Sequence, residues 1–142
     1  MNLSKIKYEL LKNGNKIGLQ VEEETKDSLT VHTELVAKEY FANSVYFRLV
    51  VYSSGTLHMF LTFDEIEKTS DNLFLVNNFN VEHPWFKAYI INLNGSTFLE
   101  LHYTAIALEK EDEVVETVGF LLNEVLKEVT LDLLNPILKS NK

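Results

Sequence analysis

The feature that most constrains the fold of this chain is a pair of short apolar runs joined by a tight turn. Residues 44–63 read SVYFRLVVYSSGTLHMFLTF, and hydrophobic side chains recur at every second position on both sides of Ser53-Ser54-Gly55. A period of two is typical of a β-strand, and glycine accepts the positive φ that tight hairpins require. The stretch therefore predicts two antiparallel strands that are neighbours in one sheet.

A second hairpin is predicted at Asn94-Gly95, because Asn-Gly is the strongest short-range hairpin signal. It joins two further alternating runs. In all, the sequence predicts strands near residues 18–24, 28–36, 44–53, 56–63, 86–93 and 97–108. The acidic first run is the weakest of these and is expected at an edge. Strands and helices do not alternate regularly along the chain, so the pattern favours an antiparallel sheet over a parallel one.

Helical spacing of apolar residues predicts three helices. The first covers residues 3–13, with Asn2 or Ser4 as its cap and Gly14 in the position of a C′ glycine. The second has Thr69, Ser70 or Asp71 as its cap and ends near Asn80. The third is long, covers residues 109–129, and has an apolar stripe that includes Val114, Val118, Leu121, Leu122, Val125, Leu126 and Val129.

Thr130 is expected to cap a final short helical turn around residues 131–138, with Pro136 limiting its regularity. The whole order is α-β(3-4)-α-β-β-α. It predicts an α+β fold, with an antiparallel five- or six-stranded sheet and helices mainly on one face. No linker, repeat or low-complexity tract interrupts it, so residues 1–142 are expected to form a single domain.

Charge and cysteine content narrow the classes of function. The net charge of −8 argues against nucleic acid and anionic membranes as partners, because binders of both need basic surfaces. The absence of cysteine excludes disulfides and cysteine-based zinc or redox chemistry. No apolar run reaches the roughly 20 residues of a membrane helix, and the N-terminus does not read as a signal peptide. We therefore expect a cytoplasmic protein.

The histidines were considered as ligands for a metal. His58 and His102 each lie within a predicted strand, and Glu100 shares a strand face with His102. These side chains, with His32 as a further candidate, could bind a metal if their strands are neighbours. The alternative is that they are partly buried sheet histidines with one hydrogen bond each. No recognised metal spacing is present, so we expect no metal, no cofactor and no catalytic residues.

The second face of the predicted sheet is too apolar for a surface in contact with water. It carries Tyr46, Val50, Tyr52 and Phe60. Either helices lie on both sides of the sheet, or a partner protein covers this face. Few helices are available, which favours a protein partner, most simply a second copy of the chain. Trp85 joins the predicted partner-binding residues because tryptophan is frequent at interfaces; otherwise it closes one end of the core.

In its element order, the chain resembles the YbjN-like family, whose fold is that of type III secretion chaperones. The segment LVNNFNVEHPWFKAYIINLNG, residues 75–95, resembles the family's second helix, with an Asn-x-x-Asn pair at Asn77 and Asn80. Residues 113–138 resemble its closing helix and Leu-Pro tail. The resemblance implies an α+β fold that is often dimeric, binds protein segments and has no established catalytic residues.

We therefore predict a non-enzymatic protein-interaction domain, chaperone-like or regulatory, that acts as a homodimer and binds protein segments. Its partners would be a second copy of the chain and a client polypeptide, with neither nucleic acid nor membrane. Two alternatives stay open. One is a small-molecule binding module with a pocket between the long C-terminal helix and the sheet. The other is a metal-dependent enzyme that uses His58, Glu100 and His102.

Overall fold

The structure is a computed structural model that describes residues 1–139, so the last three residues of the predicted 1–142 domain lie outside the described part. Its elements are α1 (Leu3–Asn13), the 3₁₀-helix η1 (Asn15–Ile17), β1 (Gln20–Glu24), β2 (Ser28–Leu35), β3 (Val45–Tyr52), β4 (Leu57–Glu65), α2 (Ser70–Glu82), β5 (Lys87–Leu93), β6 (Ser96–Ala105), α3 (Glu111–Val125) and α4 (Glu128–Lys139). No helix of this part is both long and apolar enough to cross a bilayer.

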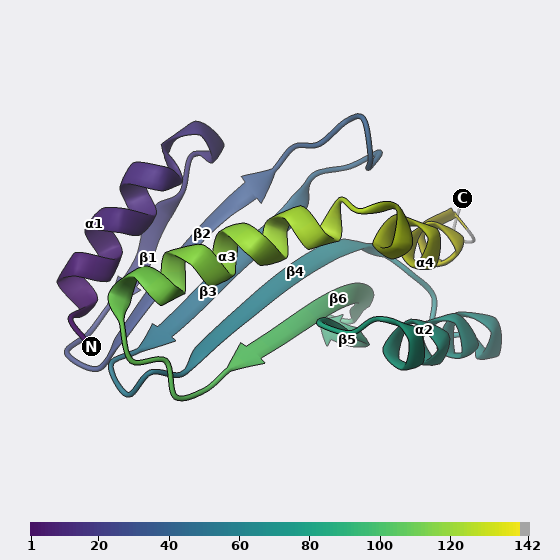
Figure 1. Cartoon of the computed structure of the whole chain (residues 1–142). Coiled ribbons are helices and arrows are strands. Elements are labelled where there is room, and N and C mark those ends of the chain that lie inside the picture. The colour runs from purple at the N-terminus through teal and green to yellow at the C-terminus, as the bar shows by residue number, and fades with distance from the viewer. Residues whose placement is uncertain (140–142) are drawn as a thin grey trace.

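The six strands form one antiparallel sheet in the order β1-β2-β3-β4-β6-β5. The predicted α+β fold with an antiparallel sheet is confirmed. Figure 1 shows α1 and α3 lying across the same face of this sheet, with α2 and α4 packed together beyond one end of it. Within residues 1–139, the strand order departs from chain order at β4, which pairs with β6 rather than with β5, and α2 connects β4 to β5.

A single hydrophobic core lies between the helices and one face of the sheet. On β3 and β4, alternate residues are buried, so Leu49, Met59 and Leu61 are fully enclosed. Val114 and Leu121 of α3 cover them from the helix side, as their helical spacing predicts. The residues between these buried positions point the other way, and their side chains form the opposite face of the sheet.

The two predicted hairpin turns are confirmed. Gly55 has a φ of 98° between β3 and β4, and its carbonyl accepts a hydrogen bond from the Leu108 amide. Asn94 and Gly95 have φ values of 53° and 88°, the left-handed pair of a two-residue hairpin. Both turns depend on the local conformational freedom of glycine or asparagine, which is why the sequence identifies them.

The predicted long helix over residues 109–129 is wrong at its C-terminal end. It breaks at Leu126 and Lys127, and the following residues form α4, a complete helix of 12 residues with Pro136 inside it. At the break the Thr130 hydroxyl donates to the Glu124 carbonyl that would otherwise continue the helix. The tertiary part of this arrangement is the contact of Thr130 with His83 Nε2, at 2.8 Å. Val129, predicted in the apolar stripe, is 63% exposed.

The end of α1 also differs from its predicted form. Gly14 has a φ of −90°, and the left-handed glycine is Gly18, after η1. Gly14 is required for a different reason, since a Cβ there would lie 2.8 Å from the Leu10 carbonyl oxygen and from Leu19. The short η1 that this tight passage creates becomes part of a pocket described below.

Candidate functional site: the open sheet face and a lateral pocket

We call the surface formed by the side chains that point away from the helices the open face. No helix of residues 1–139 packs on it, and its side chains are absent from the core cluster, although neighbouring side chains bury two of them, Val50 and Thr30. Strand register brings together the following residues on this face: Thr30, His32, Tyr46, Arg48, Val50, Tyr52, His58, Phe60, Thr62, Tyr89, Ile91, Glu100, His102 and Thr104. Four of the five predicted partner-binding residues are therefore on one surface.

A row of rings crosses the open face from β3 to β5. Phe60 stacks on His102 with their centroids 4.5 Å apart, and His58 stacks on His102 at 5.4 Å. Tyr52 meets His58 edge-on at 6.1 Å, and Tyr89 lies 6.4 Å from His102 at the other end. The outer tyrosines are 40% and 47% exposed, respectively. The row is ordered by its own contacts, but its ends are exposed to solvent.

The centre of the open face is hollowed. A shallow depression of about 400 Å³ is lined by residues that include Val50, Tyr52 and Phe60. Tyr46 lines a neighbouring depression of about 330 Å³ and contacts His32, whose Nδ1 lies 3.3 Å from the tyrosine oxygen. Burial and the nearby Glu22 carboxylate raise the pKa of the Tyr46 hydroxyl, so it stays protonated and able to donate.

The two central histidines lie within hydrogen-bond distance of one another and of Thr104. His58 Nδ1 lies 3.2 Å from His102 Nε2, and the Thr104 hydroxyl lies 3.1 Å from each of these nitrogens. If both imidazoles were protonated, each would place an N–H group against the N–H group of the other, and neither nitrogen could accept a hydrogen bond. Burial and the His58 charge accordingly lower the pKa of His102.

The metal ligands of the alternative hypothesis, His58, Glu100 and His102, are not assembled into a site in residues 1–139. Glu100 points along the same face as His102, and burial raises the pKa of its carboxyl. Among residues 1–139, however, no group of three or more histidine or carboxylate side chains is placed to hold a metal ion. The geometry of His58 and His102 matches the hydrogen-bonded sheet histidines considered as the alternative.

Trp85 is not part of the open face. It lies in the connection between α2 and β5, where its ring meets Phe120 of α3 edge-on at 5.4 Å. Both side chains are more than 40% exposed and line a small depression on the helix side. The sequence identifies the residue type but not its side of the sheet, because that depends on where the connection crosses the core.

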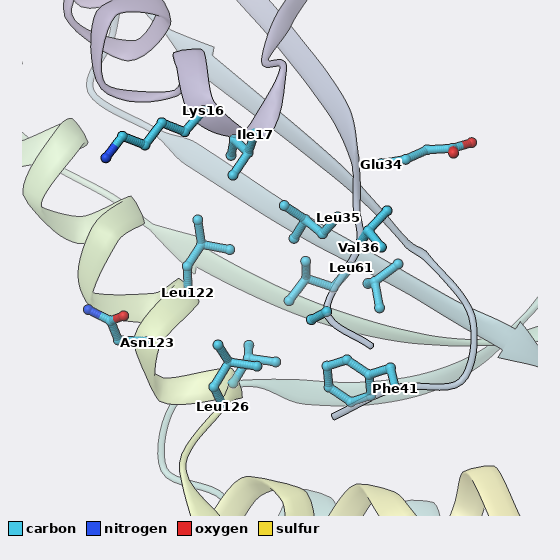
Figure 2. A pocket seen from close by; sticks show the side chains of 13 residues that line it. Lys16, Ile17, Glu34, Leu35, Val36, Phe41, Leu61, Leu122, Asn123 and Leu126 are labelled. Atoms are coloured by element: carbon cyan, nitrogen blue, oxygen red, sulfur yellow. The ribbon is translucent and has the colours of Figure 1, made fainter. Parts of the chain in front are cut away.

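A separate, deeper pocket opens on the helix side, where the end of β2 approaches the end of α3. It has a volume of about 440 Å³, and its thirteen lining residues are apolar except for Lys16, Glu34 and Asn123. Figure 2 shows apolar side chains from η1, β2, β4 and α3 around the space, with Phe41 from the loop that follows β2. A pocket between the C-terminal helix and the sheet matches the place predicted for a small-molecule site.

The polar residues of this pocket lie on two sides of its rim. In Figure 2 the Lys16 ammonium and the Asn123 amide extend outward on the α3 side, and the Glu34 carboxylate extends outward on the opposite side, so none of the three points among the apolar side chains. Within the described residues, neither the ammonium nor the amide has a hydrogen bond or ion-pair partner. Sequence reasoning missed Lys16 and Asn123, because η1 is a turn created by tight packing and gives no periodic signal.

The two edges of the sheet differ in how they are protected. Edge strand β1 is short, carries three glutamates and contains a register irregularity, features that discourage strand pairing. Edge strand β5 is more apolar. The Asn80 side chain bonds both the N–H and the C=O of Ala88, at 2.5 and 2.9 Å. In an antiparallel edge strand, alternate residues direct their backbone N–H and C=O groups away from the neighbouring strand. On β5 these are Ala88, Ile90 and Asn92, and within the described residues the groups of Ile90 and Asn92 have no hydrogen-bond partner.

Comparisons of the chain with protein families, with curated proteins and with solved structures return no match. The resemblance to the YbjN-like family and to type III secretion chaperones therefore stays a prediction. What the structure itself shows is an α+β chain with one covered sheet face and one open face.

Proposed function

We propose that this chain is a non-enzymatic, cytoplasmic protein-interaction domain, chaperone-like or regulatory, that forms a homodimer and binds protein segments. The observation that carries the proposal is the open face, which has aromatic residues at its centre and no helix of the described part over it. The resemblance to YbjN-like proteins agrees with this function.

The composition of the open face supports a protein partner. Interfaces are enriched in tyrosine, phenylalanine and arginine and depleted in lysine, rather than uniformly apolar. The open face has this mixture, with Tyr46, Tyr52, Phe60 and Arg48 near its centre, while Lys87 is at its edge. Arg48 is already paired with Glu22 at 3.0 Å, so burying it would not leave an unpaired cation.

The size of the open face suits a dimer. Strands about 4.8 Å apart that rise about 3.4 Å per residue give six strands of eight residues a footprint of roughly 700 Å². A standard interface buries about 800 Å² on each partner. The second copy therefore fits as occupant, provided that most of the face takes part.

Sedimentation analysis of matched charge variants tests the dimer. Tyr46→Glu and Phe60→Glu place a carboxylate on the open face, while Tyr8→Glu and Val81→Glu do so at exposed helix positions. We expect wild type and both helix variants to be dimeric. The open-face variants should dissociate at least about tenfold more readily, because an unpaired buried charge costs more than about 1.4 kcal/mol. A wild-type chain that stays monomeric at high concentration would contradict self-association.

Binding of a client segment has separate support at β5. The outward N–H and C=O groups of Ile90 and Asn92 can pair with an extended strand, beside exposed Tyr89 and Leu93. The net charge of −8 favours a basic segment. The probe is an alternating Lys–Val peptide, with a Glu–Val peptide as its control.

The matched variants for this test are Asn92→Pro and Asn92→Ala. Both remove the side chain that accepts from the Gly95 amide at 3.1 Å, but only proline removes the outward backbone N–H. Fluorescence polarisation should show that the alanine variant binds the Lys–Val peptide and the proline variant binds it several-fold more weakly. Equal binding by the two variants would show that the peptide does not pair with β5.

A further inference from the structure

The lateral pocket is independent of the open face, and its chemistry indicates a different ligand. We propose that it binds an amphipathic monocarboxylate, with the acyl chain among the apolar side chains and the carboxylate beside Lys16 and Asn123. The proposal stands or falls separately from the proposed protein-interaction function, because the two surfaces lie on opposite sides of the sheet.

The size of the pocket favours a small molecule over a polypeptide. Ligand pockets typically have volumes of about 300–1,000 Å³ and are mostly apolar with a few polar groups. This pocket has about 440 Å³, and separate elements contribute its walls: Ile17 from η1, Leu35 from β2, and Leu122 and Leu126 from α3 or its end. A polypeptide would also need partners for its backbone, which the aliphatic walls do not offer.

Parts of the pocket wall are exposed without a ligand. Val36 is 67% exposed and Ile17 is 39% exposed, although both belong to an otherwise apolar lining. An acyl chain would remove this surface from water. Each methylene that enters should tighten binding about fourfold until the space is filled.

The polar groups at the rim of the pocket select the head group. The Lys16 ammonium and the Asn123 amide are donors on the α3 side of the rim, and the single lining carboxylate, Glu34, lies on the opposite side, with all three ends pointing away from the apolar side chains. Neither donor is occupied by another described residue. An anionic acceptor is complementary to this pair, whereas an amine would meet the ammonium with like charge.

The experiment is calorimetric titration of the full chain with hexanoate, octanoate, decanoate and dodecanoate, all kept below their micelle-forming concentrations. We expect saturable binding of one molecule per chain, with affinity that rises along the series. Decanol should bind more weakly than decanoate, and decylamine more weakly still. Absence of saturable binding, or uptake of several molecules per chain, would overturn the proposal.

Three variants locate the site. Ala37→Trp fills the pocket from its half-buried rim and should abolish binding of all four acids. Lys16→Met should weaken decanoate about two- to fivefold, as expected for an exposed ion pair, and leave decanol unchanged. Lys110→Met, which removes a lysine at the other end of α3, is the matched control and should bind like wild type.

The folded state of Ala37→Trp is checked by thermal unfolding, and Leu122→Trp, also at a half-buried lining position, provides a second filled pocket. If a folded filled variant still binds decanoate with wild-type affinity, the pocket is not the site. If decanol and decylamine bind as tightly as decanoate, the carboxylate assignment is wrong.

Discussion

His83 shows how one residue can connect the end of α2 with the segment before β5 and with α4. Its Nδ1 accepts from the amides of Trp85 and Phe86, at 3.2 and 3.1 Å, and its Nε2 lies 2.8 Å from the Thr130 hydroxyl. Thr130 in turn donates to the Glu124 carbonyl. Two backbone donors at Nδ1 require the neutral imidazole with its proton on Nε2, because a second proton would face two N–H groups.

The hydrogen bonds of His83 predict a dependence of stability on pH. Burial lowers the pKa of His83 below its ordinary 6.5, so the unfolded chain takes up a proton that the folded chain refuses. The contribution of neutral His83 to the free energy of unfolding is complete above about pH 6.5 and should fall as the pH decreases below that value. Urea unfolding at pH 8.0 and 5.5 measures the difference.

The variant His83→Phe keeps the stacking on Phe79 but removes both bonding nitrogens. It should lower the free energy of unfolding at pH 8.0 by about 2–4 kcal/mol, because buried donors lose their acceptor. Its free energy of unfolding should also decrease less between pH 8.0 and pH 5.5 than that of the wild type. An unchanged pH dependence would mean that another group, such as His102, controls it.

Asn80 is a second residue whose role is clear only in the structure. Its side chain donates to and accepts from Ala88, as a neighbouring strand would, and joins α2 to β5. Asn80→Ala leaves both backbone groups of buried Ala88 without a partner and should cost about 1–3 kcal/mol of stability. Asn77→Ala, at the exposed residue three positions earlier, is the control. It should change the free energy of unfolding, measured by chemical denaturation, only a little. Equal effects would contradict this role.

At the scale of elements, we expect alanine substitutions at two glycines to change the stability in opposite directions. A Cβ on Gly55 would lie 2.4 Å from the Leu108 carbonyl oxygen, and its φ is 98°, whereas a Cβ on Gly119 within α3 would meet nothing within 4 Å. Gly55→Ala should therefore destabilise the protein by more than about 1 kcal/mol. Gly119→Ala should stabilise it by about 0.5–1 kcal/mol through helix propensity. Thermal unfolding of both variants checks the pair, and a stable Gly55→Ala variant would refute the close contact.

The elements also show what sequence can predict and why the rest needs tertiary contacts. The turns at Gly55 and Asn94 and the cap at Thr69, whose hydroxyl accepts from the Asn72 amide, depend on neighbouring residues and were predicted. The break after Val125 was not, because the Thr130–His83 contact that stabilises it joins residues 47 positions apart. The position of Trp85 on the helix side of the sheet was missed for the same kind of reason.

For the candidate sites, the alternation of Tyr46, Val50, Tyr52 and Phe60 was enough to place them on one face, since side chains repeat every two residues in a strand. The pocket could be placed only roughly, between the long C-terminal helix and the sheet. Two of its three polar lining residues, Lys16 and Asn123, come from η1 and α3, and η1 follows the close passage at Gly14. The periodicity of the sequence contains no information about how these two elements are placed.

At the scale of the whole molecule, the structure separates two surfaces. Among residues 1–139, α1 and α3 cover one side of the sheet and leave a pocket at its margin, while the other side presents aromatic rings to solvent. The central claim is that a second copy of the chain covers those rings. It predicts that their exposure changes with protein concentration, whereas the exposure of side chains on the outer surfaces of the helices does not.

Hydroxyl-radical footprinting read by mass spectrometry measures this exposure residue by residue. Oxidation of Tyr46, Tyr52 and Phe60 should fall several-fold between dilute and concentrated protein, whereas oxidation of Tyr8, which is 63% exposed on α1, should stay constant and serves as the internal reference. If Tyr52 and Phe60 are oxidised equally at both concentrations, the open face stays in contact with water and the proposed dimer is wrong.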